Sequence, residues 1–477
     1  MIKNIVSDKT PIIAKRTRPI SYGRQEKATI TFHGGTGSVT GANFLLEIGG
    51  KRILIDCGLT QGYKVADDVN WDPFTYDPKT VDALFITHGH VDHIGRIPKL
   101  IHEGFRGQIY STDPTRGIAL PMLEDTAGIL NHNTELELDK IYTEENINIA
   151  FSRWTGTGYR EKISLTPELE ATFYNAGHIL GSAMVLFAYR GKNILFTGDL
   201  GNSPSPLLPD YDKVADVDYL IMESVYGDRN HESRESRRLK LAHVIQDNHR
   251  RRGTLIIPTF SLERSQELMF ELDSLLEDER IPVMPIFFDS PLAIRLTDVF
   301  KQYKSYFNET AAKAMSPGKY LFDFPGLHNT LKSEESKMIA EVPNPKIVIA
   351  GSGMSTGGRV VHHEKHYLPD ANNTLLLTGY QAVGTPGRLI EEGVKKIHIT
   401  GEDVVIRAHI EKISGYSGHM DSDGLLNFVS DMEESLKKVY VVMGEPKSSM
   451  FLVQKIRDNL AIEAYAPEKG QSVVLDF

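Results

Sequence analysis

The chain has 477 residues, of which 40% are hydrophobic and 24% are charged, and its formal net charge is −10. This length exceeds one ordinary hydrophobic core, so at least two domains are expected in a composition typical of a soluble globular protein. No apolar run is long enough to span a membrane, which argues against membrane association. The acidic balance does not by itself indicate a nucleic-acid binder, although a local cationic groove would suffice for one.

Cys57 is the single cysteine, so no intrachain disulfide can form, and a cytoplasmic protein fits best. Residues 1–10 are mixed and charged and contain no apolar signal core. Three basic clusters, at residues 15–18, 237–238 and 249–252, are interpreted as solvated faces.

In chain order, strands are predicted at residues 29–32, 43–48, 51–56 and 81–87. The glycine-rich segment 33–41 is read either as a phosphate-approaching loop or as a hairpin turn. A helix should follow residue 93, and residues 115–151 should be largely helical. Residues 164–199 return to strands, and residues 217–224 form a buried strand.

The loop between the strand at 81–87 and its following helix carries His88, His90, Asp92 and His93. Imidazole and carboxylate groups are ligands of zinc, and less often of manganese or iron. In an extended loop His88 and His90 point the same way, whereas Asp92 and His93 can face a second locus, as a two-metal site requires. The pattern therefore predicts a metal site rather than a histidine-rich surface loop.

Further candidate ligands and carboxylates follow strands elsewhere: Asp56, His178 and Asp199. Taken with the histidine-rich loop, their order resembles the four motifs of the metallo-β-lactamase superfamily. That resemblance implies one metal on His88, His90, His178 and Asp199, and a second on Asp92, His93 and Asp199. Two zinc ions are expected, with manganese as an option, and Asp56 would orient the ligand loop.

After residue 227 the pattern changes to alternating helices and strands, which predicts an inserted parallel α/β domain. The whole order resembles the β-CASP branch of the superfamily, which includes RNase J and the endonuclease of mRNA 3′-end processing. The resemblance rests on Glu223 and His419 and on the segments 289–293, 352–363 and 379–385. The predicted fold is an αββα sandwich interrupted by a β-CASP domain, with boundaries 1–222, 223–415 and 416–477.

The resemblance also implies a function, namely hydrolysis of single-stranded RNA in the groove between the two domains by in-line attack of water on phosphorus. Asp56, Asp92, Asp199, Glu223 and His419 form the catalytic set, in which Glu223 would hold His419 as the proton donor to the leaving oxygen. An ion pair at the domain junction is the structural alternative for Glu223. The oligomeric state is open, with a homodimer as one option.

The loop at residues 355–359 opens a helix and could bind a phosphate. The candidate residues are Ser355, Gly357, Arg359 and His363. A tight strand-to-helix turn is an equally weighted alternative for these residues.

One position departs from the family pattern, because Met443 stands where a further histidine would hold the second metal. A thioether is a poor zinc ligand beside oxygen donors, so weak occupancy of the second site is expected. Two other readings stay open: a non-catalytic β-CASP subunit that binds RNA or a nuclease partner, and a hydrolase of DNA or small molecules.

Overall fold

The computed structural model describes residues 27–61, 69–131, 137–314, 321–379, 381 and 384–476. The basic cluster at residues 15–18, and Tyr380 and Ala382 of the segment 379–385, lie outside these ranges. Within the described part, no helix combines the length and apolarity that crossing a membrane requires.

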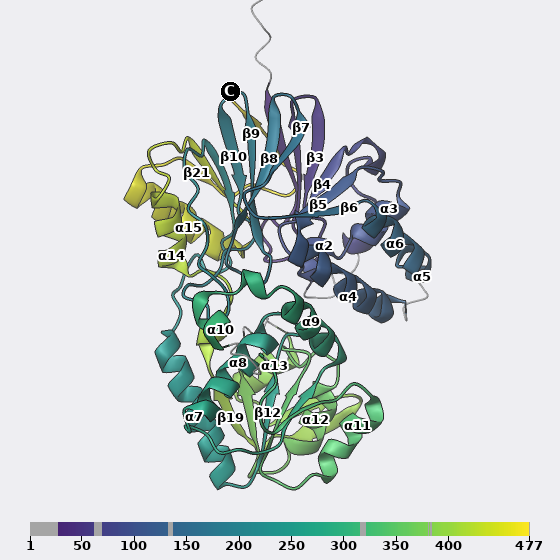
Figure 1. Ribbon diagram of the computed structural model, residues 1–477, viewed down its shortest axis with the longest axis vertical. Coiled ribbons are helices and arrows are strands. Elements are labelled where there is room, and N and C mark those ends of the chain that lie inside the picture. Colours follow the sequence, from purple (N-terminus) through teal and green to yellow (C-terminus); the bar gives the residue numbers. More distant parts are fainter. Residues whose placement is uncertain are drawn as a thin grey trace, which may run out of the picture.

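Two seven-stranded sheets pack face to face in the upper part of Figure 1. The first sheet has the order β22 (Ser472–Leu475), β1 (Ala28–Gly34), β2 (Asn43–Ile48), β3 (Lys51–Ile55), β4 (Ala83–Phe85), β5 (Gln108–Thr112) and β6 (Trp154–Thr157). The second has the order β21 (Ala464–Tyr465), β20 (Lys438–Val441), β11 (Tyr219–Met222), β10 (Lys192–Phe196), β9 (Ala183–Tyr189), β8 (Leu169–Asn175) and β7 (Lys162–Thr166). Alternate residues of both sheets, such as Phe32, Phe85 and Phe187, form the core between them.

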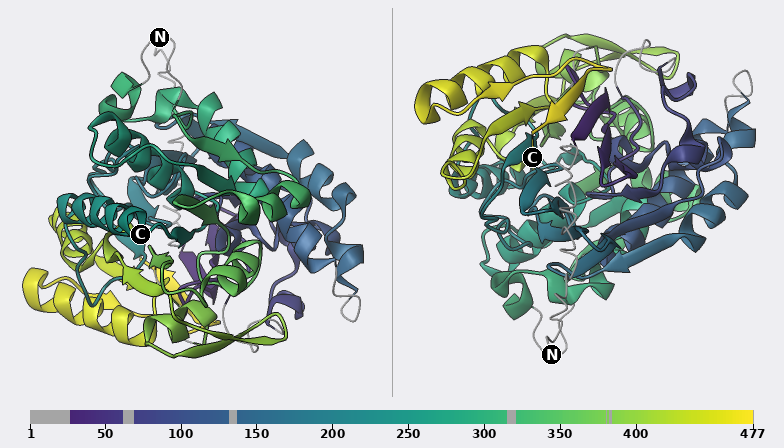
Figure 2. Two further views of the ribbon diagram at one scale, coloured as in Figure 1. Left: turned by 90° about the horizontal axis from the view of Figure 1, so that it is seen from below. Right: turned by 90° about the horizontal axis from the view of Figure 1, so that it is seen from above.

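Helices cover both outer faces of this sandwich, and Figure 2 shows them on opposite sides in both views. The first sheet is covered by α2 (Val91–Ile94), α3 (Ile97–His102), α4 (Asp113–Leu130), α5 (Leu138–Ile141) and α6 (Glu144–Ser152). The second is covered by α14 (Ser422–Ser430) and α15 (Pro446–Leu460). The layers are therefore helix, sheet, sheet, helix, as the sequence predicts.

The chain leaves the sandwich after β11 and builds a separate six-stranded sheet in which every pair is parallel. Its order is β14 (Leu327–Asn329), β13 (Ile286–Asp289), β15 (Lys346–Ala350), β12 (Thr254–Pro258), β16 (Thr374–Leu377) and β19 (His409–Lys412). Its helices are α7 (Arg234–Arg250), α8 (Arg264–Glu277), α9 (Pro291–Gln302), α10 (Glu309–Ala314), α11 (Ser333–Met338), α12 (Val360–Tyr367) and α13 (Pro386–Glu391). The strands β17 (Lys396–Ile399) and β18 (Glu402–Val405) form a separate antiparallel hairpin in the same part of the chain.

The two parts are packed together, because one hydrophobic cluster runs from α3 and α4 into α8 and α9. An ion pair between Glu124 of α4 and Arg295 of α9 lies at the same junction. One expectation is wrong here: Arg237 is buried rather than solvated, because its guanidinium pairs with Glu271 and lies 4.3 Å from the centre of the Tyr416 ring.

Candidate metal centre

The histidine-rich loop is held open between a buried strand and a short helix. β4 ends at Phe85, and α2 begins at Val91. Gly89 must be a glycine, because a β-carbon there would lie 2.5 Å from Cγ2 of Ile118. Gly198, just before Asp199, has a φ of +54° and would bring a β-carbon within 2.6 Å of Cβ of Thr87. The approach at Gly198 brings the loops that carry His88 and Asp199 together, and the approach at Gly89 seats the histidine loop on α4.

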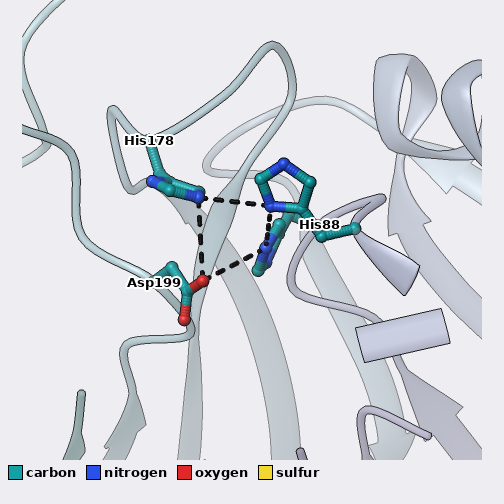
Figure 3. Close-up of side chains that lie close together, drawn as sticks. His88, His178 and Asp199 are labelled. Carbon is teal, nitrogen blue, oxygen red and sulfur yellow. Dashed lines mark hydrogen bonds and ion pairs between the residues drawn. The ribbon is translucent and has the colours of Figure 1, made fainter. Parts of the chain in front are cut away.

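Four donor atoms face one point in space: His88 Nε2, His90 Nδ1, His178 Nε2 and Asp199 Oδ2. His90 Nδ1 lies 3.0 Å from His88 Nε2 and 3.3 Å from His178 Nε2. Asp199 Oδ2 lies 3.4 Å from His88 Nε2 and 3.6 Å from His178 Nε2. Figure 3 shows His88, His178 and Asp199 turned toward one another from three separate loops.

These separations fit a metal ion. Ligand bonds of 2.0–2.1 Å in a tetrahedron place neighbouring donors about 3.3 Å apart. Burial is the main cause that lowers the pKa of His88, His90 and His178, so the rings are neutral and offer lone pairs. Burial alone would raise the pKa of Asp199, but His93 and His88 hold it well below its usual range, so it stays ionised. A cluster of three neutral imidazoles and one carboxylate indicates a metal.

Asp199 also faces a second locus through its other oxygen. Asp199 Oδ1 lies 3.5 Å from His93 Nε2, which lies 3.8 Å from Asp92 Oδ2. Both Asp199 Oδ1 and His93 Nε2 are buried and have no hydrogen-bond partner among the described residues. Orphaned buried polar atoms of this kind are rare in folded proteins, and a second ion between them would satisfy both.

Asp56 anchors the loop from behind. Its Oδ1 accepts a hydrogen bond from the Thr87 amide at 2.8 Å, and its Oδ2 accepts one from the Thr87 hydroxyl at 2.8 Å. Oδ2 also lies 2.7 Å from His93 Nδ1, which fixes the ring so that Nε2 faces Asp199. This is the contact expected of a residue that orients a metal ligand.

Met443 lies beside the second locus, in a small apolar pocket that it shares with His93, Asp56 and Phe44. Its side chain belongs to the core between the two sheets and packs on Gly35 of the glycine-rich segment. Its amide donates to the Gly35 carbonyl at 2.6 Å. The glycine-rich segment is thus the connection between β1 and β2 and packs against Met443.

A second cluster of titratable residues borders the metal centre and consists of Asp199, Glu223 and His419. The segment 418–420 pairs with residues 200–202, which places His419 Nδ1 3.2 Å from Glu223 Oε1 and 3.9 Å from Asp199 Oδ2. Burial works to lower the pKa of His419, but the Glu223 and Asp199 carboxylates outweigh it and raise the pKa. Glu223 is itself fixed, because Oε1 accepts the Leu200 amide at 2.7 Å.

Three family models match the chain in order. Residues 45–210 match the metallo-beta-lactamase superfamily domain, residues 265–390 the Beta-Casp domain, and residues 403–467 the Zn-dependent metallo-hydrolase RNA specificity domain. The chain is 35% identical to ribonuclease TTHA0252 of Thermus thermophilus over 88% of its own length and 94% of the relative's. The chain belongs to the β-CASP family of the metallo-β-lactamase superfamily.

Other relatives agree with this assignment. The RNase J-like protein of Methanocaldococcus jannaschii is 32% identical, with 92% of this chain and 98% of that protein covered. Transcription termination factor FttA of Methanosarcina mazei is 31% identical, with 94% and 71% covered. A crystal structure of a protein of unknown function from Enterococcus faecalis V583 shares the fold, with a TM-score of 0.57, 14% identity, and 94% of this chain and 100% of that chain covered.

The residues of the β-CASP domain that the sequence offers as phosphate ligands have internal partners. Arg359 donates from Nη1 to Asp289 Oδ1 at 2.6 Å and to the Thr330 carbonyl at 2.9 Å. His363 Nε2 lies 2.7 Å from Asp289 Oδ2, and the buried Ser355 hydroxyl donates to Glu364. Gly357 lies in the same turn, and phosphate binding by this loop stays a prediction.

Sequence reasoning missed three groups that hold the centre. Thr87 bridges Asp56 and the ligand loop, and the Gly418 carbonyl lies 3.0 Å from His178 Nδ1. Arg264 of the β-CASP domain lies against Gly418, where a β-carbon would meet Nη2 at 2.2 Å. Thr87 adjoins the motif and could have been noticed, whereas the other two contacts join residues far apart in the sequence.

A polar cavity of about 250 Å³ lies beside these ligands, between the sandwich and the β-CASP domain. Both crossings between the domains line it, with His231 and Arg237 on one side and Gly418 on the other, and His178 is part of its wall. The metal centre therefore lies at the domain junction.

Proposed function

We propose that this β-CASP protein is a metal-dependent phosphodiester hydrolase that cleaves single-stranded RNA. The observation that carries the proposal is the convergence of His88, His90, His178 and Asp199 on one point, next to His419, whose pKa the Glu223 carboxylate raises. Two relatives that align with this chain over nearly their whole length are named a ribonuclease and an RNase J-like protein. The matched RNA specificity domain supports RNA as the substrate.

Zinc is the metal we propose, because three imidazoles and one carboxylate suit it better than magnesium or calcium. When bound, the metals supply activation of water and neutralisation of charge on the phosphoryl oxygens. Asp92 and His93 would share Asp199 with the first site, and Met443 adds no hard donor there. We therefore propose a first site that binds zinc more tightly than the second.

The residues of the chain divide the remaining work. Asp56 holds His93 by its Nδ1 atom so that Nε2 stays directed at the second locus. Two carboxylates face the Nδ1 atom of His419 and favour its protonated form. We propose that His419 gives its other ring proton, on Nε2, to the leaving oxygen of the RNA, and that Glu223 sustains the charge while it does so.

A cytoplasmic location belongs to the same proposal. Cys57 is buried, free and, through burial, has a pKa raised to about 12, so it is an unreactive thiol that needs no oxidising compartment.

The second candidate function, a non-catalytic subunit that binds RNA or a nuclease partner, is favoured by one observation, Met443. The proposed first site argues against it, because the donor atoms of His88, His90, His178 and Asp199 lie close together. Cleavage assays separate the two candidates.

The test is cleavage of a 5′-labelled single-stranded RNA by the full chain with zinc, with manganese and with a chelator. Asp199→Ala and His90→Ala should abolish cleavage, whereas Asp458→Ala, on the exposed face of α15, should cleave like the wild type. Single-stranded DNA and a β-lactam are run alongside as competing substrates. Cleavage that survives in both ligand variants, or in chelator, would refute the proposal. RNA binding without cleavage would favour the non-catalytic subunit.

A further inference from the structure

An exposed aromatic ring lies at the end of β12. Phe260 is 38% exposed and belongs to none of the hydrophobic clusters formed by the described residues. Its ring rests on two glycines: a β-carbon would lie 2.8 Å from Phe260 Cδ2 at Gly353 and 3.4 Å from Cε2 at Gly379. The ring is therefore supported by backbone, and no side chain at these two positions covers it.

Phe260 lies where the parallel sheet changes winding direction. β12 leads through α8 to β13, whereas its neighbour β15 leads through α12 to β16, on the opposite side of β12. The two helices cover opposite faces, because α8 shares a cluster with Leu255 and Ile257 and α12 shares one with Ile256. In open parallel sheets, the crevice outside the carboxyl ends of two such strands is the position at which ligands bind.

This edge of the sheet faces the metal centre. The loop after β12 reaches the sandwich at Glu263, whose Oε2 accepts the Leu180 amide at 3.1 Å. Arg264 lies against Gly418, whose carbonyl lies 3.0 Å from His178 Nδ1. Phe260 precedes Arg264 by four residues, a length of chain that spans at most about 14 Å. Phe260 therefore lies in the same loop that reaches the domain junction at Glu263 and Arg264.

The residues around the ring suit a nucleotide. The Ser261 and Ser290 hydroxyls lie 3.3 Å apart at the ends of β12 and β13, and both border Gly351. Arg264, whose Nη1 pairs with Glu267 Oε2 at 2.9 Å, lies on the side of the metal centre. The Phe260 ring, which packs on two glycines, offers a surface on which a base can stack. The neighbouring hydroxyls and the Arg264 guanidinium are polar groups for the sugar-phosphate backbone of the same nucleotide.

We propose that Phe260 is a stacking platform for one base of the RNA, within a few nucleotides of the scissile phosphate. This inference rests on the proposed function, because it takes single-stranded RNA as the ligand. Stacking is available to every base, so the subsite would add affinity and position the strand without choosing its sequence. Phe260 is thus a substrate-binding residue and takes no part in proton transfer.

The test measures RNA binding in the full-length Asp199→Ala protein, so that cleavage does not consume the ligand. Phe260→Ala should weaken binding by about 5- to 150-fold, the range expected for one stacked base. Phe260→Trp should bind like the Phe260 parent, and Phe260→Leu, which keeps apolar volume without a full ring, should fall between. Phe451→Ala removes a ring that is 50% exposed on α15 and serves as the matched control, with no expected change.

A second RNA series identifies the base. Each oligonucleotide of this series carries one abasic position, and that position is moved along the strand. At one position the abasic site should lower the affinity of the parent by the same factor as Phe260→Ala does. At that position the abasic site should lower the affinity of the Phe260→Ala protein by less than about twofold. An equal abasic loss in both proteins, or unchanged binding by Phe260→Ala, would overturn the inference. Unfolding temperatures of all variants, compared with the parent, exclude a folding defect.

The two proposals fail separately. If the wild-type protein cleaves no RNA but binds it in a way that depends on Phe260, the proposed hydrolase function is refuted and the stacking subsite is retained. Metal-dependent cleavage that Phe260→Ala leaves unchanged, in rate and in KM, would keep the hydrolase and remove the subsite. A wild-type protein that neither binds nor cleaves RNA would refute both.

Discussion

Asp56→Asn tests how the metal loop is oriented. In the wild type one carboxylate accepts three donors: the Thr87 amide, the Thr87 hydroxyl and His93 Nδ1. An asparagine has the same shape but only one acceptor oxygen. If its oxygen faces His93, its NH₂ group opposes the Thr87 amide; if it is flipped, the NH₂ group opposes His93 Nδ1 and the Thr87 hydroxyl.

Both orientations leave a buried donor without its acceptor, and each therefore lowers the free energy of unfolding. Leaving a buried donor without its partner costs about 1–3 kcal/mol, and hydrogen bonds to a charged acceptor are at the upper end. We therefore expect the metal-free variant to lose about 2–3 kcal/mol of unfolding free energy. In the flipped orientation His93 must accept through Nδ1, so its proton moves to Nε2 and blocks the atom that would bind the second metal.

The assay is a zinc titration with a competing chelating dye, together with thermal unfolding of the metal-free protein. Zinc affinity should fall by about 10- to 100-fold, with the loss on the weaker of the two binding steps. Asp82→Asn is the matched control, since Asp82 is an exposed carboxylate that accepts the Arg52 amide far from the metal loop.

The reasoning would be refuted by an Asp56→Asn protein that binds zinc and unfolds like the wild type. A loss confined to the tighter binding step would also contradict it, because Asp56 contacts His93 and not His88, His90 or His178 in the described structure.

Three further predictions follow from other groups. Burial raises the pKa of Glu364 to about 7, above an unfolded value of about 4.3, so between these pH values the folded chain holds a proton that the unfolded chain releases. The free energy of unfolding should therefore fall as pH rises from about 4 to 7. Glu364→Gln should flatten this part of the profile of unfolding temperature against pH. Glu223→Gln removes a carboxylate that raises the pKa of His419, so the alkaline limb of the kcat profile should move to lower pH, and an unmoved limb would exclude His419 as the acid. Met443→His places an imidazole beside His93, and mass spectrometry of the native protein should show bound zinc rising from about one to about two ions per chain; two ions already present in the wild type would contradict the weak second site.

The secondary structure around the metal loop was accessible from local sequence pattern. Apolar runs ending in Asp56, Thr87 and Asp199 are β3, β4 and β10, because a buried strand needs a continuous apolar stretch and polar residues mark its end. The inserted domain was visible for the same reason, since its strands and helices alternate with short connections. Spacing also predicted that His88 and His90 act together and that Asp92 and His93 face elsewhere.

The interpretation of charged residues was less accurate, because partners are chosen in three dimensions. Arg237 belongs to a basic pair on a charged helix, and only the fold shows that Glu271 and Tyr416 bury it. Arg359 stands in a glycine-rich loop that looks suited to a phosphate, yet Asp289, 70 residues earlier, takes its guanidinium. Sequence periodicity reports which side of an element is apolar and carries no information about a polar partner on another element.

By itself the sequence determined the ligand types, their order and their positions at strand ends, because these depend on residues within a few positions of one another. The family resemblance implied that Asp199 faces two loci and that Glu223 holds His419, and the tertiary structure gives these relations their geometry, with Asp199 Oδ1 3.5 Å from His93 Nε2 and Glu223 Oε1 3.2 Å from His419 Nδ1. Only the tertiary structure shows that Arg264 of the β-CASP domain lies against Gly418 beside the metal centre. These relations join segments up to hundreds of residues apart, and they exist only because two packed sheets and a third parallel sheet bring the ends of their strands to one junction.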